Sequence, residues 1–399
     1  MENIPQPPSS VENDLPGEVV SDILIRLPAK PLSQFRTVSK SFNTLISHPS
    51  FIKSHLHHST STHDDETLML IHSLFCFNST NPVTTHHSQS PHISNSGSIR
   101  LPRSFNLPPR YNRASVIGSV NGLVCFLLTT GVGFVTPVIH IWNPSLSAVM
   151  TVAPYAVVGD GVLDLHYGFG FDLVNDDYKV VNFARMFRPP GFLTAGDCVF
   201  QDWMKVEVYS MKKGSWGVIS DRFPSSVTCV FDDAKVSITG SDGRDGRVHW
   251  LCCGGIRTKQ IIVAFDLGVE KFSQLSLPDS VGKWRNGRAN VLGLLGGKIC
   301  VMGYDENGDF EVWVMSEYGV SESWVKDYAF SQFGGGIFPI GFTLNNEFVF
   351  QDDNKCLVLY DQKAAKVKSF NVTVSGWEST ERFMIVPYVD SLVWIAPAN

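Results

Sequence analysis

The stretch that decides the fold is residues 14–56, DLPGEVVSDILIRLPAKPLSQFRTVSKSFNTLISHPSFIKSHL. Its apolar residues recur at helical spacing from Val19 to Leu27, and Pro28 follows directly. Because the residue before a proline is pushed out of the α region, we expect the first helix to end there. The same periodicity predicts three more helices, over 30–38, over 40–46 and from Pro49 onward.

This helical stretch is small for an independent domain. About forty residues are at the edge of what folds without a metal, a disulfide or a partner. Leu15, Pro16 and Leu32 exceed what the internal core needs. Two interpretations are open: they are ordinary packing residues, or they form an apolar docking patch for another protein. A small docking module ahead of a much longer β-type chain is the organisation of an adaptor.

The stretch resembles an F-box. The matching residues are Leu15-Pro16, Glu18-Val19-Val20, Ile23-Leu24, Arg26-Leu27-Pro28-Ala29-Lys30, Phe35-Arg36, Val38, Lys40, Leu45-Ile46 and Pro49. The chain departs from the family pattern at Pro31, Ser33, Thr37, Ser39 and Phe42, the last of which keeps an aromatic side chain for the core.

The resemblance implies that this module binds a Skp-type adaptor, and through it a cullin–RING ubiquitin ligase. It assigns apolar contact with the adaptor, and no catalytic role, to Leu15, Pro16, Ile23, Leu24, Leu27, Pro28 and Leu32.

Composition narrows the class of protein. Of 399 residues, 43% are hydrophobic and 18% are charged, and the formal net charge is −6. This charge argues against a nucleic-acid partner, which calls for a basic patch. No segment reaches the roughly 18 uninterrupted apolar residues of a membrane helix. The N-terminus lacks a secretory signal, and the eight cysteines lack the spacing of a disulfide scaffold. We expect a reduced protein of the cytoplasm, the nucleus or both.

Polar segments suggest the domain boundaries. We expect a disordered N-terminus over 1–13, the F-box over 14–56, a linker over 57–66 and one large β domain over 67–396. A second polar segment over 78–98 is rich in Ser, Thr and His and is expected to be a long exposed loop.

Within the β domain one unit recurs. Short apolar runs separated by Gly, Asn and Asp turns are typical of all-β structure. The unit contains a strand ending in an aromatic residue, at Trp142, Tyr209, Phe265, Trp313 and Tyr360, and three return strands carry Trp216, Phe272 and Trp324. Repeats of ~40–50 residues with about four strands suggest propeller blades.

The ends of the β domain can complete the ring. Residues 67–77 and 382–395 would pair as a sixth blade and remove the exposed sheet edges. The predicted fold is therefore mainly β, a short helical F-box followed by a propeller of about six blades. Seven blades and a pair of β-sandwiches remain as alternatives.

The β domain also resembles the plant F-box-associated interaction domain. The resemblance rests on 118–124, 141–144, 167–172, 177–181, 206–210 and 246–251. A kelch repeat would need Gly-Gly at a fixed place in each blade, and only Gly254-Gly255 and Gly296-Gly297 approach it.

Several site-like patterns have simpler interpretations. Asp305 to Asp309 open like a calcium loop but lack its later glycine and glutamate, and Asn307-Gly308 is a hairpin signal. Cys252 and Cys253 are adjacent on a predicted strand and point to opposite faces, which disfavours zinc. We therefore expect no catalytic residue, metal or other cofactor.

Two segments combine aromatic residues with arginine, as interface hot spots do. They lie at 185–192 and 283–286, in expected loops, and loop aromatics packed onto the domain are the competing interpretation. The candidate target-binding residues are Phe187, Arg188, Phe192, Trp284 and Arg285.

Together these patterns favour the non-catalytic substrate receptor of an SCF-type ubiquitin ligase. The F-box would bind the Skp-type adaptor and the β domain an unidentified target protein. The alternatives are a propeller hydrolase acting on sugars, and an adaptor-binding scaffold that works without ubiquitin transfer.

Overall fold

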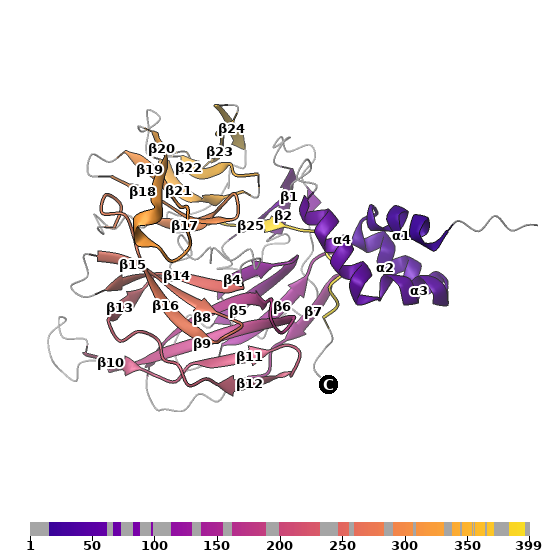
Figure 1. The fold of residues 1–399 in the computed structure, drawn as a ribbon, viewed down its shortest axis with the longest axis horizontal. Coiled ribbons are helices and arrows are strands. Elements are labelled where there is room, and N and C mark those ends of the chain that lie inside the picture. The colour runs from indigo at the N-terminus through magenta and orange to yellow at the C-terminus, as the bar shows by residue number, and fades with distance from the viewer. Residues whose placement is uncertain are drawn as a thin grey trace, which may run out of the picture.

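The computed structural model consists of a four-helix module and a β-propeller (Figure 1). It describes residues 16–61, 67–72, 83–87, 97–98, 113–129, 137–154, 162–188, 199–231, 246–254, 259–282, 290–305, 309–330, 337–343, 345–352, 354, 356–363, 365–370 and 383–395. The predicted N-terminal disorder over 1–13 lies outside these residues.

The helices form the N-terminal module. They are α1 (Gly17–Ile25), α2 (Ala29–Val38), α3 (Lys40–Ile46) and α4 (Pro49–Ser61). α1 ends before Pro28 as predicted, and Pro16 and Pro28 directly precede α1 and α2. Ser39 caps α3 by accepting the Phe42 N–H at 3.1 Å. The expected linker is shorter than predicted, because α4 continues through Ser61. None of the described helices is long and apolar enough to cross a membrane.

The described strands form six sheets. Five consist of strands consecutive in sequence. The first contains β4 (Arg113–Val120), β5 (Leu123–Thr129), β6 (Val138–Asn143) and β7 (Ala148–Thr151), and the second contains β8 (Val162–Asp172), β9 (Asp177–Arg188), β10 (Val199–Trp203), β11 (Glu207–Ser210) and β12 (Ser215–Val218). The third contains β13 (Val227–Val230), β14 (Arg247–Gly254), β15 (Lys259–Asp266) and β16 (Lys271–Ser276), the fourth β17 (Val291–Leu295), β18 (Lys298–Tyr304), β19 (Phe310–Met315) and β20 (Trp324–Phe330), and the fifth β21 (Ile337–Phe342), β22 (Phe348–Asp352), β23 (Leu357–Asp361) and β24 (Lys366–Phe370).

The remaining sheet joins both ends of the β domain. Its order is β25 (Phe383–Tyr388), β1 (Thr67–His72), β2 (Val83–His87) and β3 (Gly97–Ser98). β25 pairs antiparallel with β1 from Thr67 opposite Tyr388 to His72 opposite Phe383, as the sequence predicted. The expected loop over 78–98 is wrong in part, because β2 and β3 lie within it. β2 pairs with β1 and β3 pairs with β2, and these ladders satisfy backbone groups whose partners a polar sequence does not indicate.

The propeller prediction is confirmed by where the repeated aromatic residue falls. Trp142, Tyr209, Phe265, Trp313 and Tyr360 lie on β6, β11, β15, β19 and β23, the third paired strand of each consecutive sheet. The predicted return strands are the fourth strands, and two aromatic pairs lie directly opposite each other: Tyr209 with Trp216, and Phe265 with Phe272. Apolar side chains pack between neighbouring sheets, so the core is distributed around the ring.

The two ends of the strands define two faces of the propeller. We call the turn face the end that carries the β4–β5, β6–β7 and β8–β9 turns, and the loop face the opposite end. The β4–β5 turn is Asn121-Gly122, both at positive φ (53° and 79°), the Asn-Gly pattern of a tight hairpin. β9 begins at the turn face and therefore ends at the loop face, at Arg188. β16 likewise ends at the loop face, at Ser276.

Buried histidines make the propeller sensitive to acid. His249 on β14 is buried, its Nε2 lies 2.9 Å from the Tyr318 hydroxyl, and burial lowers its pKa to about 3. Burial likewise lowers the pKa of His140 to about 4. An unfolded histidine titrates near ~6.5, so between these values the unfolded chain binds more protons. The free energy of unfolding therefore falls as pH drops below about 6.5, by up to ~1.4 kcal/mol per pH unit for each group.

His249→Gln, which stays neutral, is expected to reduce this slope between about pH 4 and pH 6. The measurement is denaturant unfolding over a pH series. His48→Gln, at an exposed position, is the control and should keep the wild-type slope. A His249→Gln slope equal to wild type would contradict the prediction.

Candidate functional site: the helical module and its seat on the propeller

The helical module is completed by the C-terminal segment of the chain. Its core contains five buried side chains of its own, Leu24, Ala29, Leu32, Ile46 and Phe51. Leu392, which follows the last strand of the β domain, joins the same cluster at 2% exposure. Residues 389–395, which follow β25, therefore contribute to the hydrophobic core of the module through Leu392.

The first sheet of the propeller holds this segment in place. Asn143 at the end of β6 donates from Nδ2 to the carbonyls of Ser391 (3.0 Å) and Val393 (2.8 Å). The Ser391 N–H donates to Ser145 Oγ at 3.0 Å. Gly122 leaves room for the segment, since a Cβ there would lie 2.4 Å from both the Val389 carbonyl oxygen and Ser391 Cβ. Residues 389–395 thus run across the turn face.

The segment also contacts the start of α2. Pro28 has no side chain that can cap this helix, and the Ala29 N–H instead donates to Asp390 Oδ2 at 2.6 Å. A carboxylate at a helix N-terminus satisfies a free backbone donor and complements the helix dipole. The Arg36 guanidinium lies over the Trp394 ring, 5.3 Å from its centroid.

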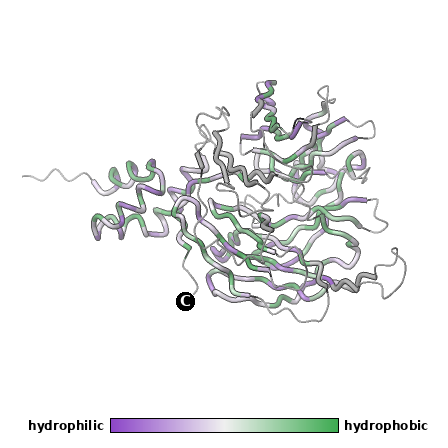
Figure 2. Tube along the Cα trace, turned by 180° about the vertical axis from the view of Figure 1, so that it is seen from behind, coloured by the Kyte–Doolittle hydropathy of each residue, from purple (hydrophilic) through white to green (hydrophobic). Residues whose placement is uncertain are grey.

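The last helix makes a further contact with the turn face. Lys53 on α4 pairs with Asp176 in the β8–β9 turn at 3.1 Å. Inside the module, His55 Nε2 lies 3.0 Å from the Leu27 carbonyl oxygen, and burial lowers the pKa of His55. Figures 1 and 2 show the helices projecting from one side of the propeller, so most of the module's surface stays open.

The open surface of the module carries large apolar side chains. Ile23 is 51% exposed, Val38 69% and Val19 42%. Pro16 and Pro28 are also exposed. Apolar side chains grouped on a small module are the kind of surface that another protein covers.

The structure separates the residues that the F-box resemblance assigned to adaptor contact. Pro16, Ile23 and Pro28 lie at the surface and Leu27 is half-buried, whereas Leu24 and Leu32 belong to the module's core. Leu24 and Leu32 are buried in the same cluster as Ala29 and Leu392, and this burial leaves them almost no exposed surface for contact with an adaptor. Leu15 lies outside the described residues.

The predicted target-binding segments connect to the loop face. The expected loop over 185–192 begins later than predicted, because β9 continues to Arg188 and pairs with β10. Phe187 and Arg188 are therefore strand residues, whose side chains are not described. Phe192, Trp284 and Arg285 lie outside the described residues.

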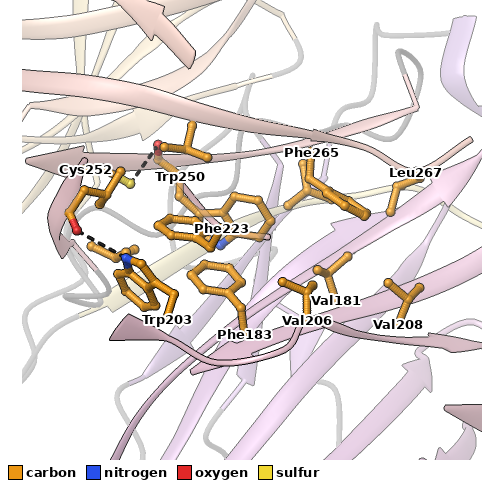
Figure 3. Close-up of a cluster of buried hydrophobic side chains, with 14 residues drawn as sticks. Val181, Phe183, Trp203, Val206, Val208, Phe223, Trp250, Cys252, Phe265 and Leu267 are labelled. Atoms are coloured by element: carbon orange, nitrogen blue, oxygen red, sulfur yellow. Dashed lines mark hydrogen bonds between the residues drawn. The ribbon is translucent and has the colours of Figure 1, made fainter. Parts of the chain in front are cut away.

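Arg185 is the described arginine of this region, and it is buried. Its guanidinium lies 4.9 Å from the Trp203 ring centroid, and Nη1 donates to the Thr228 carbonyl at 2.5 Å. On the same strand, the ring of Phe183 stacks on that of Phe223, with the two ring centroids 4.1 Å apart. Figure 3 shows these two rings next to Trp203. Arg185 thus anchors a strand, and packing is the right interpretation for this residue.

No metal centre is found among the described residues, where no group of three or more His, Cys, Asp or Glu side chains could hold an ion. On either side of the calcium-like segment β18 and β19 pair antiparallel, and the Asp309 N–H donates to Asp305 Oδ1 at 2.9 Å.

Sequence reasoning missed the contribution of Asp390, Leu392 and Trp394. The run 391–395 was assigned to the closing strand, and β25 ends before it at Tyr388. A short apolar run such as 392–395 indicates burial but not which partner provides it, so no local signal pointed to the helical module.

Comparison with known proteins agrees with this architecture. A family model described as "F-box associated beta propeller domain" matches residues 72–390, and an F-box domain model matches residues 13–54. The chain is similar to F-box protein CPR1 of Arabidopsis thaliana, with 29% identity covering 78% of this chain and 72% of that protein. It is also similar to F-box/kelch-repeat protein At3g23880 of Arabidopsis thaliana, with 26% identity covering 79% of each.

Among solved structures, TolB from Acinetobacter baumannii matches with 9% identity and a TM-score of 0.39. The match covers 82% of this chain and 64% of TolB. The two family models together span the helical module and the propeller. The chain belongs to the F-box-associated β-propeller family and carries an N-terminal F-box.

Proposed function

We propose that the chain is the substrate-recognition subunit of an SCF-type ubiquitin ligase. The observation that carries the proposal is an F-box whose exposed apolar side chains, Val19, Ile23 and Val38, are left open while its other side is fixed to a propeller. In this role the F-box binds a Skp-type adaptor and the propeller binds a target protein. The chain contributes position, by raising the effective concentration of the target, and no chemistry of its own. Its place of action is the cytoplasm, the nucleus or both.

The target would bind at the loop face. The F-box, the C-terminal segment and Lys53 all contact the turn face, which leaves the loop face unobstructed by the F-box. Both predicted target-binding segments connect strand ends at the loop face, after β9 and after β16. This arrangement would present the target on the side of the propeller away from the F-box.

Ile23→Asp is expected to abolish adaptor binding. A charge in a closely packed apolar interface costs at least 2 kcal/mol at a hot spot, which corresponds to about thirtyfold in Kd or more. The measurement is the affinity of the purified full-length chain for a Skp-type adaptor by calorimetry. Val174→Asp, at a 78% exposed position on the β8–β9 turn, is the matched control. Equal affinities for the two variants would contradict the adaptor assignment.

A scaffold role without ubiquitin transfer needs a separate test. Both roles include adaptor binding, so the reconstituted ligase must be assayed for ubiquitin transfer to proteins captured by the propeller. Transfer that is lost with Ile23→Asp and retained with Val174→Asp is the result expected of a substrate receptor. Capture without transfer would favour the scaffold.

A further inference from the structure

Two cysteines lie opposite each other on neighbouring strands of the third sheet. In the antiparallel pairing of β13 with β14, Cys229 is the direct partner of Cys253. Directly opposed residues point to the same face of a sheet, with Cα atoms about 4.5–5.5 Å apart. Disulfides span Cα separations of about 4.4–6.8 Å. The strand register therefore holds two thiols at a spacing that a disulfide can bridge.

The row continues onto a third strand. Cys253 is also paired with Gln260 on β15, so Cys229, Cys253 and Gln260 share one face of the sheet. Gln260 is fully buried, and its Oε1 accepts from Asn290 Nδ2 at 2.6 Å. Its Nε2 has no hydrogen-bond partner among the residues that the structure describes. A buried amide donor without a partner costs free energy, and a thiolate in the same row would satisfy it.

The two thiols differ in access to solvent. Cys229 is half-buried, whereas Cys253 is 1% exposed. A low-molecular-weight disulfide can therefore reach the Cys229 thiol first. The Cys253 thiol then needs to reach only the Cys229 sulfur, which lies opposite it. This is the division between an attacking and a resolving cysteine.

We propose that Cys229 and Cys253 form a reversible disulfide by exchange with a low-molecular-weight disulfide such as oxidised glutathione. The Cys229 thiolate attacks one sulfur of oxidised glutathione, whose S–S bond breaks, and the first glutathione leaves as a thiolate that takes up a proton. The Cys253 thiolate then attacks the Cys229 sulfur and expels the second glutathione. Two protein thiols are oxidised, and one oxidised glutathione is reduced to two thiols.

The disulfide would fix a strand that other parts of the propeller already hold. β13 accepts hydrogen bonds through its backbone from Arg185, at the Thr228 carbonyl, and from Trp203 Nε1, at the Val227 carbonyl, 3.2 Å away. β14 ends just beyond Cys253, at Gly254 on the loop face. The proposal does not depend on adaptor or target binding.

The test uses the reduced full-length protein incubated with oxidised glutathione, alkylated, digested without reduction and mapped by mass spectrometry. The expected product is a peptide pair linked through Cys229 and Cys253 that disappears on treatment with dithiothreitol. Cys253→Ser should instead accumulate a glutathione adduct on Cys229, because the resolving thiol is missing. Cys229→Ser should form neither product.

Cys356→Ser is the matched control, since Cys356 is the other half-buried cysteine among the described residues. It should leave the Cys229–Cys253 linkage unchanged. The proposal is overturned if Cys229 and Cys253 both stay reduced, whether or not Cys356 becomes glutathionylated, or if Cys229 links to a cysteine other than Cys253. Gln260→Met should slow the resolving step by roughly threefold, because without the amide donor less Cys253 thiolate forms, and this loss outweighs the higher nucleophilicity of the thiolate that remains. An unchanged rate would overturn the role of Gln260.

Discussion

Leu392→Ala is expected to lower the free energy of unfolding of the F-box by about 2–5 kcal/mol. Leu392 is 2% exposed and packs in the same cluster as Leu24, Leu32 and Phe51. Truncating a buried leucine removes its transfer free energy and leaves a cavity. The F-box is small and has little core to lose, so we expect it to unfold before the propeller.

The measurement is urea unfolding, with limited proteolysis as the readout of F-box unfolding. Trp394→Ala is the matched control on the same segment, because Trp394 is 57% exposed and contributes mainly its contact with Arg36. Its expected cost is about 0.5–1 kcal/mol. Equal losses for the two variants would show that residues 389–395 do not complete the core of the F-box. If they do complete it, Leu392→Ala should also weaken adaptor binding without touching the adaptor-facing residues.

Lys179→Met is expected to destabilise the propeller by about 3–5 kcal/mol. Lys179 Nζ on β9 lies 2.8 Å from Asp172 Oδ2, 2.9 Å from Glu270 Oε1 and 2.7 Å from the Leu267 carbonyl oxygen. It therefore joins the second consecutive sheet to the β15–β16 turn of the third. Removing the cation leaves the Asp172 carboxylate buried and without its counter-charge, and an unpaired buried charge is costly.

Lys53→Met makes the same substitution in an ion pair whose side chains are 65% and 53% exposed, and it should cost no more than about 1 kcal/mol. Adding Asp172→Asn to Lys179→Met should restore much of the loss. An asparagine removes the charge and keeps an oxygen that can accept from the backbone N–H groups of Val174 and Asn175. In the wild-type protein these nitrogens lie 2.9 and 3.0 Å from Asp172 Oδ1. Denaturant unfolding of the four proteins gives the comparison. A Lys179→Met loss as small as that of Lys53→Met would contradict the prediction.

The same ion pair gives a direction for the acid response. Burial acts to raise the pKa of Asp172, but its hydrogen bonds with Lys179 and Asn175 prevail and hold the pKa below its usual range. Because the folded pKa is depressed, the stabilisation is present above the unfolded value of about 3.9 and is lost as pH falls through the folded pKa. The Asp172 effect begins only below about pH 4, whereas that of His249 begins near pH 6.5, so between these two pH values the histidine contributes without Asp172.

Local patterns predicted the helices well, because each boundary depends on a residue with its own backbone constraint. Pro16, Pro28 and Pro49 begin helices or directly precede them, and Ser39 caps α3. The repeated aromatic residue likewise indicated the third strand of each consecutive sheet, since hydrophobic alternation and turn residues are local signals. The strands β2 and β3 were missed because their sequence is polar and lacks the hydrophobic alternation that marks a strand, although β2 pairs with β1 and β3 with β2.

The candidate docking residues show where local information stops. Leu24 and Ile23 are neighbours with the same chemistry, and both match the F-box pattern, yet Leu24 is buried and Ile23 is half exposed. The difference depends on which side of α1 faces the rest of the module. Arg185 likewise matched a hot-spot composition, and its burial against Trp203 depends on how neighbouring sheets pack.

The sequence by itself determined the helical and β parts of the chain, the start of each helix, the repeated β unit and the pairing of the two ends of the β domain. These follow from periodicity, proline constraints and turn residues, which act over a few residues. Only the tertiary structure decided that residues 389–395 complete the F-box and that Asp390 caps α2. Cys229 was likewise brought opposite Cys253 by folding. Such contacts join residues far apart in the chain, and their partners are set by packing of whole elements, on which no local pattern reports.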